Sequence, residues 1–421
     1  MGKDIKIVFG ENFGYRKGIF FVEDIPVRKL VLKYATPSYI YSYSQIVFQI
    51  NEIKKSFAPI SPKICYSVKA NSNLSILKII KENGLNVDIV SEGEMRRSLL
   101  AGFSPQSIVF AGVGKSEKEI ELGVRKKILC FNVENKEELD IIEKFGNKYK
   151  KKINCNLRIN LDLDIDTHEY IKTSKKETKF GLDFSIVKKI MKSRKKYKWV
   201  EIKGFHFHLG SQIKEPSPYL KALKIIKEFS NEIGFIPEMI DIGGGFGIPY
   251  LPEDKVSSIY EFGKEICNFF KEFKVKEVIL EPGRFIIGNS GILVTKVLYF
   301  KETKNKNFII VDSGMNDLIR PAFYGSKHLI IPEINKKGEK IKADVVGPIC
   351  ETGDYFGKDI EFPYKLKSGE FIIIGNAGAY SFSMSSNYNS RPRPCEILVK
   401  KKKFSLIRKR EDFKDLWIGE I

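Results

Sequence analysis

The chain has 421 residues, of which 43% are hydrophobic, and a formal net charge of +20. This length and apolar content suffice for a large core and two or three domains, and 33 Gly and 17 Pro exclude collagen-like and disordered classes. No apolar run reaches the roughly 18 residues of a membrane span. The charged N-terminus does not resemble a signal peptide. We therefore expect a soluble cytoplasmic protein without a membrane partner.

The positive charge raises the alternative of a nucleic-acid-binding protein. The basic residues, however, are isolated lysines and short runs such as 400–403, and they alternate with Glu in segments such as 115–119. No arginine-rich stretch is interleaved with aromatic residues. This pattern favours a solvated lysine-rich surface that attracts small anions, and we expect no nucleic-acid partner. Six scattered cysteines without a C-x-x-C pair argue against zinc ribbons and disulfide scaffolds.

Between residues 60 and 290, short apolar runs alternate with longer amphipathic stretches of helical period. Eight of the runs are rich in β-branched residues and predict strands: 63–68, 87–90, 108–111, 128–133, 154–159, 204–208, 239–242 and 278–280. Strand–helix alternation implies a parallel sheet with right-handed crossovers. Eight such units are typical of a closed (β/α)8 barrel of roughly 250 residues.

The flanking segments predict a second, mainly antiparallel β domain. Strand-like runs at 291–298, 308–312, 371–374 and 396–399 have no long helical pattern between them. We expect the C-terminal part to form a β-barrel or sandwich that the N-terminal segment completes. The expected boundaries are 36–288 for the α/β barrel and 1–35 with 289–421 for the β domain.

Reactive side chains follow the first and last predicted barrel strands, where functional groups gather in this fold. Lys69 closes the first strand. A lysine in a partly dry barrel mouth can form a Schiff base, although a strand-end lysine can also simply extend to solvent. Glu281 closes the eighth strand, where it is either a functional carboxylate or an internal partner of Arg284.

Two further strand ends carry a histidine pair and a glycine run. His206 and His208 point to the same side of the sixth strand. Without a matching third ligand they favour an imidazole stacked on an aromatic ligand over a metal site, with Ser211 as a phosphate contact. The glycines at 243–245 let backbone N–H groups approach a phosphate. A lysine, a phosphate cradle, a stacking imidazole and a buried carboxylate together describe a pyridoxal-phosphate site, and we expect no metal.

Motifs along nearly the whole chain resemble the alanine-racemase-like (fold type III) pyridoxal-phosphate decarboxylases, and within them the enzymes that act on diaminopimelate. The shared short motifs are YSVKAN at 66–71, DIVSEGE at 88–94, FNVE at 131–134, THEYIKT at 167–173, KFG at 179–181, HFHLGSQ at 206–212, GGG at 243–245, EPGR at 281–284 and CETGD at 350–354. Two segments are much more specific, MNDLIRP at 315–321 and SMSSNYNSRP at 383–392.

The resemblance implies that the cofactor is pyridoxal 5′-phosphate, and it implies a role for individual residues. Lys69 binds the cofactor aldehyde, His208 stacks on the ring beside His206, and Glu281 holds the pyridinium nitrogen. The phosphate contacts would be Ser211, Gly243, Gly244, Gly245, Gly283, Arg284 and Tyr380. Asp88, Glu94 and Arg158 would surround the lysine and the ring.

The same resemblance implies a substrate site and a homodimer. Arginine suits a carboxylate because it binds bidentately, so a distal carboxylate would take Arg284, Arg320 and Tyr324, with Tyr380 nearby. Glu351 would take the distal ammonium group. Cys350 and Glu351 would come from the partner subunit, with Cys350 placed to deliver a proton. Lys69, His208, Glu281 and Cys350 are thus the expected catalytic residues.

The expected activity is the decarboxylation of meso-2,6-diaminopimelate to L-lysine and CO2, the last step of lysine biosynthesis. The alternatives within the family are decarboxylases for D-ornithine and D-lysine, L-ornithine or carboxynorspermidine. Outside catalysis, the alternative is a cofactor-binding or regulatory homologue without activity. The presence of both Lys69 and Cys350 argues against that alternative.

Overall fold

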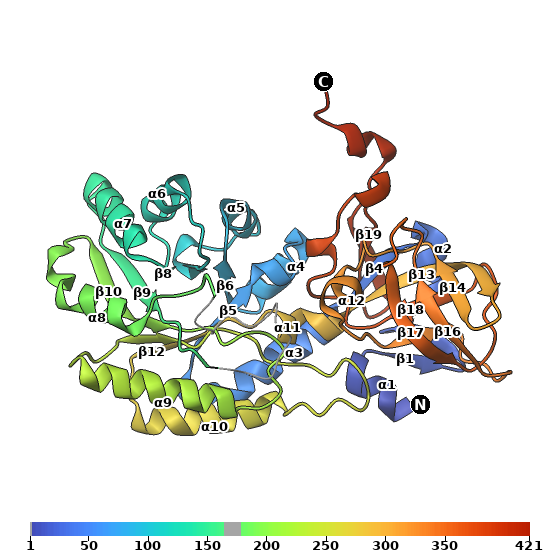
Figure 1. Ribbon diagram of the computed structural model, residues 1–421, viewed down its shortest axis with the longest axis horizontal. Coiled ribbons are helices and arrows are strands. Elements are labelled where there is room, and N and C mark those ends of the chain that lie inside the picture. The colour runs from blue at the N-terminus through green and yellow to red at the C-terminus, as the bar shows by residue number, and fades with distance from the viewer. Residues whose placement is uncertain (1, 164–177) are drawn as a thin grey trace. The chain divides into compact units, whose positions relative to one another are not determined.

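The computed structural model describes residues 2–163 and 178–421, so the THEYIKT motif at 167–173 lies outside the described residues (Figure 1). The chain divides into two compact units. The barrel unit comprises Ile50–Gly247 and Val256–Phe285, and the sheet unit comprises Met1–Gln49, Ile248–Lys255 and Ile286–Ile421. Within the described ranges, no helix is long and apolar enough to cross a membrane.

The barrel unit contains a closed barrel of eight parallel strands, which confirms the predicted (β/α)8 architecture (Figure 1). Strand β12 pairs with β5 and so closes the ring. The strands are β5 (Lys63–Ser67), β6 (Asn86–Ile89), β7 (Ile108–Phe110), β8 (Cys130–Val133), β9 (Ile153–Arg158), β10 (Val200–His206), β11 (Met239–Asp241) and β12 (Glu277–Leu280). Each of them overlaps one of the eight predicted runs.

A helix follows each barrel strand, and local sequence signals set the helix ends. These helices are α4 (Leu74–Glu82), α5 (Glu92–Leu100), α6 (Glu117–Lys126), α7 (Lys136–Tyr149), α8 (Phe184–Lys192), α9 (Ser217–Glu232), α10 (Ile259–Glu272) and α11 (Arg284–Ile287); α3 (Tyr43–Ser56) precedes β5. In α4, Asn73 caps the N-terminus by accepting the Ser75 N–H. Helices α6 and α10 begin with capping boxes at Ser116 and Ser258. These caps satisfy backbone donors that a helix leaves unpaired.

Side chains from several strands fill the barrel interior, as is usual for this fold. One buried cluster joins Cys65, Val109, Cys130, Met239 and Ile279, which lie on five different strands. Burial raises the pKa of the Cys65 and Cys130 thiols well above the ordinary value. These two cysteines are therefore inert packing residues.

The sheet unit carries a nine-stranded, mostly antiparallel sheet and a small three-stranded sheet, which confirms the predicted second β domain. The large sheet runs β17-β16-β14-β13-β4-β19-β20, while β18 pairs with β13 and β15. Its strands are β4 (Ser38–Ser42), β13 (Gly291–Glu302), β14 (Asn307–Val311), β15 (Ile330–Pro332), β16 (Ile341–Val346), β17 (Tyr355–Phe362), β18 (Phe371–Ile374), β19 (Cys395–Lys400) and β20 (Lys403–Arg408). The small sheet is β1 (Phe13–Arg16), β2 (Ile19–Val22) and β3 (Ile25–Pro26), and the helices are α1 (Gly2–Phe9), α2 (Val27–Tyr34) and α12 (Arg320–Tyr324).

The expected domain boundaries stay a prediction, but one strand bears on them. Strand β4 lies after the expected boundary at residue 36, yet it pairs with β13 and β19 in the large sheet. All five of its residues are buried. A fully buried strand has the same continuous apolar sequence pattern in a barrel and in a sheet. Its pairing partners therefore could not be deduced from the local pattern.

Gly204 gives a test of barrel packing. A Cβ built on Gly204 in β10 would lie 1.7 Å from the carbonyl oxygen of Met239 in β11. Because that oxygen belongs to backbone, Gly204→Ala should destabilise the protein by about 2 kcal/mol or more. The control is Gly93→Ala in α5, where the nearest atom is 3.8 Å away and alanine should stabilise by up to ~1 kcal/mol. Urea unfolding measures both, and equal stability of the two variants would contradict the expected packing.

Candidate active site

A cavity of about 390 Å³ lies in the barrel unit, and its walls come from the ends of several strands. The structure brings five predicted site residues together there, namely Lys69, Arg158, His206, His208 and Glu281. The other walls are Val90, the loop at 111–114 that follows β7, Lys179 and Phe180. The cavity therefore occupies the place where this fold carries its chemistry.

Lys69 reaches the cavity from a short turn that follows β5. Its Nζ lies 3.0 Å from Oδ2 of the fully buried Asp88, and the lysine side chain remains 36% exposed. Burial and then the charge of Glu281 raise the pKa of Asp88 to about 7, against the opposing effect of Lys69. Glu94, the third acid predicted here, accepts the Val90 N–H at 2.8 Å. The lysine amine thus faces a carboxyl group that can take up and return a proton near neutral pH.

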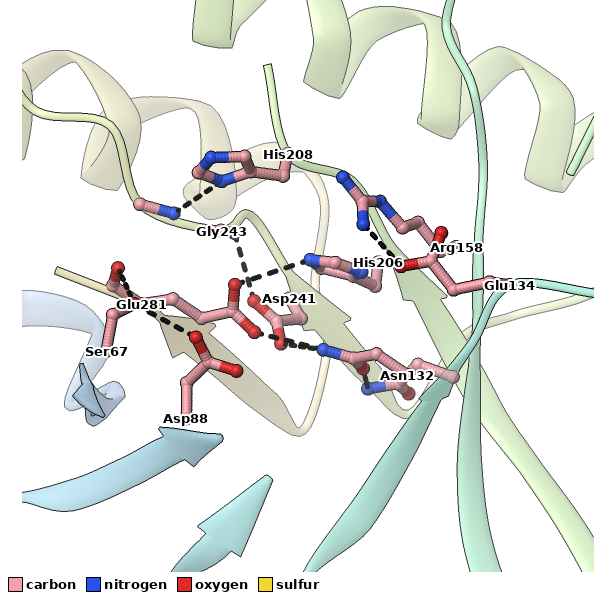
Figure 2. A network of polar contacts seen from close by, with 12 residues as sticks. Ser67, Asp88, Asn132, Glu134, Arg158, His206, His208, Asp241, Gly243 and Glu281 are labelled. Atoms are coloured by element: carbon pink, nitrogen blue, oxygen red, sulfur yellow. Dashed lines mark hydrogen bonds and ion pairs between the residues drawn. The ribbon is translucent and has the colours of Figure 1, made fainter. Parts of the chain in front are cut away.

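Glu281 is a buried carboxylate that side chains from other barrel strands contact (Figure 2). Its Oε1 accepts a hydrogen bond of 3.0 Å from Asn132 Nδ2, and its Oε2 lies 3.5 Å from His206 Nε2. Burial by itself raises the pKa of Glu281. His206, the charge of Lys69 and a hydrogen bond with Asp241 outweigh burial and hold that pKa below its usual range. Glu281 is therefore an anion at the cavity wall.

Burial favours the neutral form of both histidines at the end of β10. Burial and the positive charges of Lys69 and Arg158 lower the pKa of His208, and burial also lowers that of His206. His208 Nδ1 accepts the backbone N–H of Gly244 at 3.2 Å (Figure 2). This bond fixes the tautomer with the proton on Nε2 and orients the ring beside the cavity.

Arg158 is held by the buried carboxylate of Glu134, the last residue of the FNVE motif, for which the sequence predicted no role. Arg158 Nη1 donates to Glu134 Oε1, and both side chains are buried (Figure 2). Glu134 Oε2 accepts the Gly181 N–H at 2.8 Å. The guanidinium carbon of Arg158 also lies 4.7 Å from the ring centroid of Phe180. Glu134 therefore fixes both Arg158 and the KFG motif, two parts of the cavity wall.

The glycine run after β11 is required by close backbone packing. A Cβ on Gly244 would lie 1.9 Å from the Glu281 carbonyl oxygen, and one on Gly245 would lie 2.2 Å from that of Gly210. Gly243 and Gly245 also have positive φ, +69° and +101°, which glycine adopts without strain. At the neighbouring strand ends, Arg284 Nη2 donates to Ser211 Oγ at 2.9 Å. Gly283 precedes Arg284 and is buried. This region offers backbone amides and one guanidinium group to an anion.

Five predicted site residues lie in the sheet unit, and the structure brings two of them together. Arg320 begins α12 and is buried, with its guanidinium carbon 5.3 Å from the ring centroid of Tyr324. Arg320 Nη2 also donates to Ser326 Oγ at 3.0 Å. The half-buried Tyr380 has a positive φ of 55°. Arg320 and Tyr324 therefore form one local arrangement, and their role in substrate binding stays a prediction.

Cys350 and Glu351 lie in an exposed loop whose backbone is tied down on both sides. Cys350 is exposed, whereas the other five cysteines are buried. Its N–H donates to Asn389 Oδ1 at 2.9 Å. Asp354 accepts the N–H of Ile349 at 2.7 Å and that of Met315 at 2.6 Å. The two most specific motifs thus hold the CETGD loop, a role for Asp354 and Asn389 that sequence reasoning missed.

Comparison with known proteins assigns the chain to a family. Residues 43–288 match the model "Pyridoxal-dependent decarboxylase, pyridoxal binding domain". Diaminopimelate decarboxylase of Aquifex aeolicus is 44% identical over 402 residues, 95% of each chain. The solved diaminopimelate decarboxylase of Helicobacter pylori, complexed with L-lysine, has a TM-score of 0.88 and 39% identity over 94% of this chain and 99% of that one. The enzyme of M. jannaschii, in co-complex with L-lysine, has a TM-score of 0.93 and 33% identity over 98% of both chains. The chain belongs to the diaminopimelate decarboxylase family of pyridoxal-dependent decarboxylases, as its motifs predicted.

Proposed function

We propose that this protein decarboxylates meso-2,6-diaminopimelate at its D-configured carbon and releases L-lysine and CO2, the last step of lysine biosynthesis. The observation that carries the proposal is the nearly full-length similarity to diaminopimelate decarboxylases, two of which are solved with L-lysine. The cavity with Lys69 and the ionised Glu281 supports it independently. We further propose that the protein acts in the cytoplasm and binds no nucleic acid.

Pyridoxal 5′-phosphate is the cofactor of this family, and the residues of the barrel unit fit it. A partly buried amine, an anion for the pyridinium nitrogen and a backbone surface without room for a Cβ all lie at one end of the barrel. We propose that Lys69 binds the aldehyde and Glu281 the ring nitrogen. The proposed phosphate contacts are Ser211, Gly243, Gly244, Gly245, Gly283, Arg284 and Tyr380. The bound cofactor supplies an electron sink for the electron pair left when CO2 departs.

The side chains around the cofactor would move and hold protons. Asp88, with a pKa of about 7, accepts a hydrogen bond from the Lys69 amine and would exchange a proton with it. Glu281 would keep the ring nitrogen protonated because its own pKa lies below the usual range. His208, neutral and fixed by Gly244, would stack on the ring without adding charge. Arg158 and Glu134 would hold the wall as a closed ion pair.

The substrate side of the proposal rests on residues of the sheet unit. Arg320 and Tyr324, with Arg284 and Tyr380, would bind the distal carboxylate, and Glu351 the distal ammonium group. We propose a homodimer in which Cys350 and Glu351 come from the partner subunit, with Cys350 returning a proton to the carbon that lost CO2. Cys350 is exposed in the single chain, as a residue that acts in another subunit must be.

The first prediction for this proposal concerns Lys69. Purified protein should be yellow, and borohydride should remove the visible band and leave a pyridoxyl group that peptide mapping assigns to Lys69. Lys69→Ala should show neither the band nor the label. The control residue is Lys63, which begins β5 and forms an ion pair with Glu277 on β12. Lys63 should remain unlabelled. A colourless protein that pyridoxal phosphate cannot reconstitute would contradict the proposal.

The second prediction concerns the shared site. If Lys69 and Cys350 of different subunits form one site, mixed Lys69→Ala and Cys350→Ala subunits should recover up to about a quarter of wild-type activity, because half of the dimers each regain one site. The control mixes Lys69→Ala with the Lys69→Ala/Cys350→Ala double variant, which can form no intact site. Proven heterodimers without recovery would place Cys350 in the site of its own subunit.

The third prediction concerns specificity. A buried guanidinium group built to bind a carboxylate should reject substrates that lack it, so wild type should prefer meso-diaminopimelate over lysine and ornithine by ~10⁴ or more in kcat/KM. Arg320→Ala should lower kcat/KM for meso-diaminopimelate by at least about 100-fold. The kcat/KM of Arg320→Lys should lie between those of wild type and Arg320→Ala, since lysine keeps the charge but not the bidentate geometry. CO2 release across these amino acids measures both effects. A wild-type preference for lysine or ornithine would indicate one of the polyamine-type relatives instead.

A further inference from the structure

Two carboxyl side chains meet beneath the cavity, at the ends of adjacent parallel strands. Asp241 is the last residue of β11, and Glu281 directly follows β12. One carboxyl oxygen of each side chain lies within 4.8 Å of one of the other. The same amide nitrogen, Asn132 Nδ2, donates to Oδ2 of Asp241 at 2.8 Å and to Oε1 of Glu281 at 3.0 Å (Figure 2). These contacts form a buried carboxyl pair clamped by one asparagine.

Burial requires that this pair holds a proton. Asp241 is 0% exposed and Glu281 is 3% exposed. Two buried carboxyl groups held against one amide nitrogen cannot both ionise near neutral pH, because neither solvent nor distance screens their repulsion. One member of the pair is therefore a carboxylic acid.

The surroundings decide which member keeps the proton. Glu281 has His206 Nε2 at 3.5 Å and feels the positive charge of Lys69. The partners of Asp241 are neutral donors, namely the Asn132 amide and the Gly243 N–H at 2.9 Å from Oδ1. Burial, then the charge of Glu281, raise the pKa of Asp241 well above its ordinary value. Among the described residues, two buried thiols, Cys65 on β5 and Cys130 on β8, also interact with Asp241, and a ring nitrogen of His206 lies within 4.8 Å of its carboxyl group.

We propose that Asp241 is the protonated member of the pair and donates a hydrogen bond to Glu281, which it holds as an anion at the cavity wall. Glu281 lines the cavity and Asp241 does not belong to its lining. Asp241 is therefore a positioning residue that acts through Glu281. The inference rests on the proposed function in one respect, that Glu281 is the carboxylate at the ring nitrogen of the cofactor.

Asp241 also fixes the other end of the proposed cofactor site. Its Oδ1 accepts the N–H of Gly243, the first glycine of the run after β11. A Cβ on the next glycine, Gly244, would lie 1.9 Å from the carbonyl oxygen of Glu281 itself. One carboxyl group thus sets both the orientation of Glu281 and the start of the backbone that packs against it.

The orientation of Asn132 favours a shared proton over a metal ion at this place. His206, Asp241 and Glu281 could by residue type hold a metal, since one ligand atom of each lies within 4.8 Å of the others. The amide group of Asn132, however, is fixed with its NH2 toward both carboxyl groups, because Asn156 Nδ2 donates to its oxygen at 3.2 Å. The positive end of an amide dipole beside both acids would repel a cation and suits an anionic, proton-sharing pair.

The direct test is infrared spectroscopy of the holoenzyme labelled with 13C at the aspartate carboxyl groups. The protonated carboxyl stretch of Asp241 should persist at about pH 9, where Asp88 and Asp317, whose pKa values are raised to about 7, are ionised. Asp241→Asn should abolish this band, and the control Asp88→Asn should leave it in place. Absence of a protonated aspartate band in wild type, or its survival in Asp241→Asn, would overturn the proposal.

Kinetics supply a second readout that separates this inference from the proposed function. Glu281→Gln should retain the cofactor but lose on the order of 10²–10³ in kcat. Asp241→Ala should also lower kcat, as Glu281→Gln does, with little change in KM. Asp241→Asn should lower kcat less than Asp241→Ala does, since asparagine keeps a neutral donor for Glu281 and an acceptor for the Gly243 N–H. An alanine variant as active as wild type would overturn the positioning role. Full activity of Glu281→Gln would instead contradict the role of Glu281, and the infrared band would still test Asp241.

Discussion

The buried negative charge of Glu281 is the constraint on which the rest of the barrel mouth depends. An ionised carboxylate out of water is unstable unless donors and cations surround it. Closure of the barrel between β12 and β5 positions the Glu281 backbone, because Ser67 Oγ donates to the Glu281 carbonyl oxygen at 3.0 Å. Asn132 on β8 and His206 on β10 face the side-chain carboxylate itself.

The remaining charges in the mouth are arranged so that they do not compete with Glu281. Burial and the nearby cations lower the pKa values of both imidazoles and so favour their neutral forms. Arg158 is neutralised by Glu134, and Lys69 shares a proton with Asp88, whose pKa lies near 7. The cavity wall therefore carries the Lys69 amine beside a carboxyl group and the Glu281 carboxylate, while the ion pair and the imidazoles shape other parts of the wall. Only an amine whose proton has a nearby acceptor can act as a nucleophile.

Much of this could be predicted from sequence, because local patterns carry it. Each barrel strand is a short β-branched run, and Lys69 and Glu281 stand at strand ends, where the fold directs functional groups. Asn132, which donates to Glu281, could not be predicted in the same way. Asn132 contacts residues 109 and 149 positions away, and nothing in its own segment distinguishes it from a strand-end asparagine. The same holds for strand β4, which lies within the expected barrel range of 36–288 but pairs with β13 and β19 of the large sheet. Its pairing depends on residues far away in the sequence.

The division of labour between the two units follows from their chemistry. In the barrel unit, hydrogen bonds link Ser67 to Asp88 and to the Glu281 backbone, and Asn132 to the Glu281 carboxylate. Arg320 belongs to a separate network in the sheet unit, where Tyr324 and Tyr250 rings pack on a buried guanidinium group. A desolvated cation between aromatic rings is most stable when an anion joins it. Under the proposed function, Arg320 selects the substrate from the sheet unit while Glu281 acts in the barrel unit, so a substitution at Arg320 should alter substrate choice and leave the hydrogen bond from Asn132 to Glu281 in place.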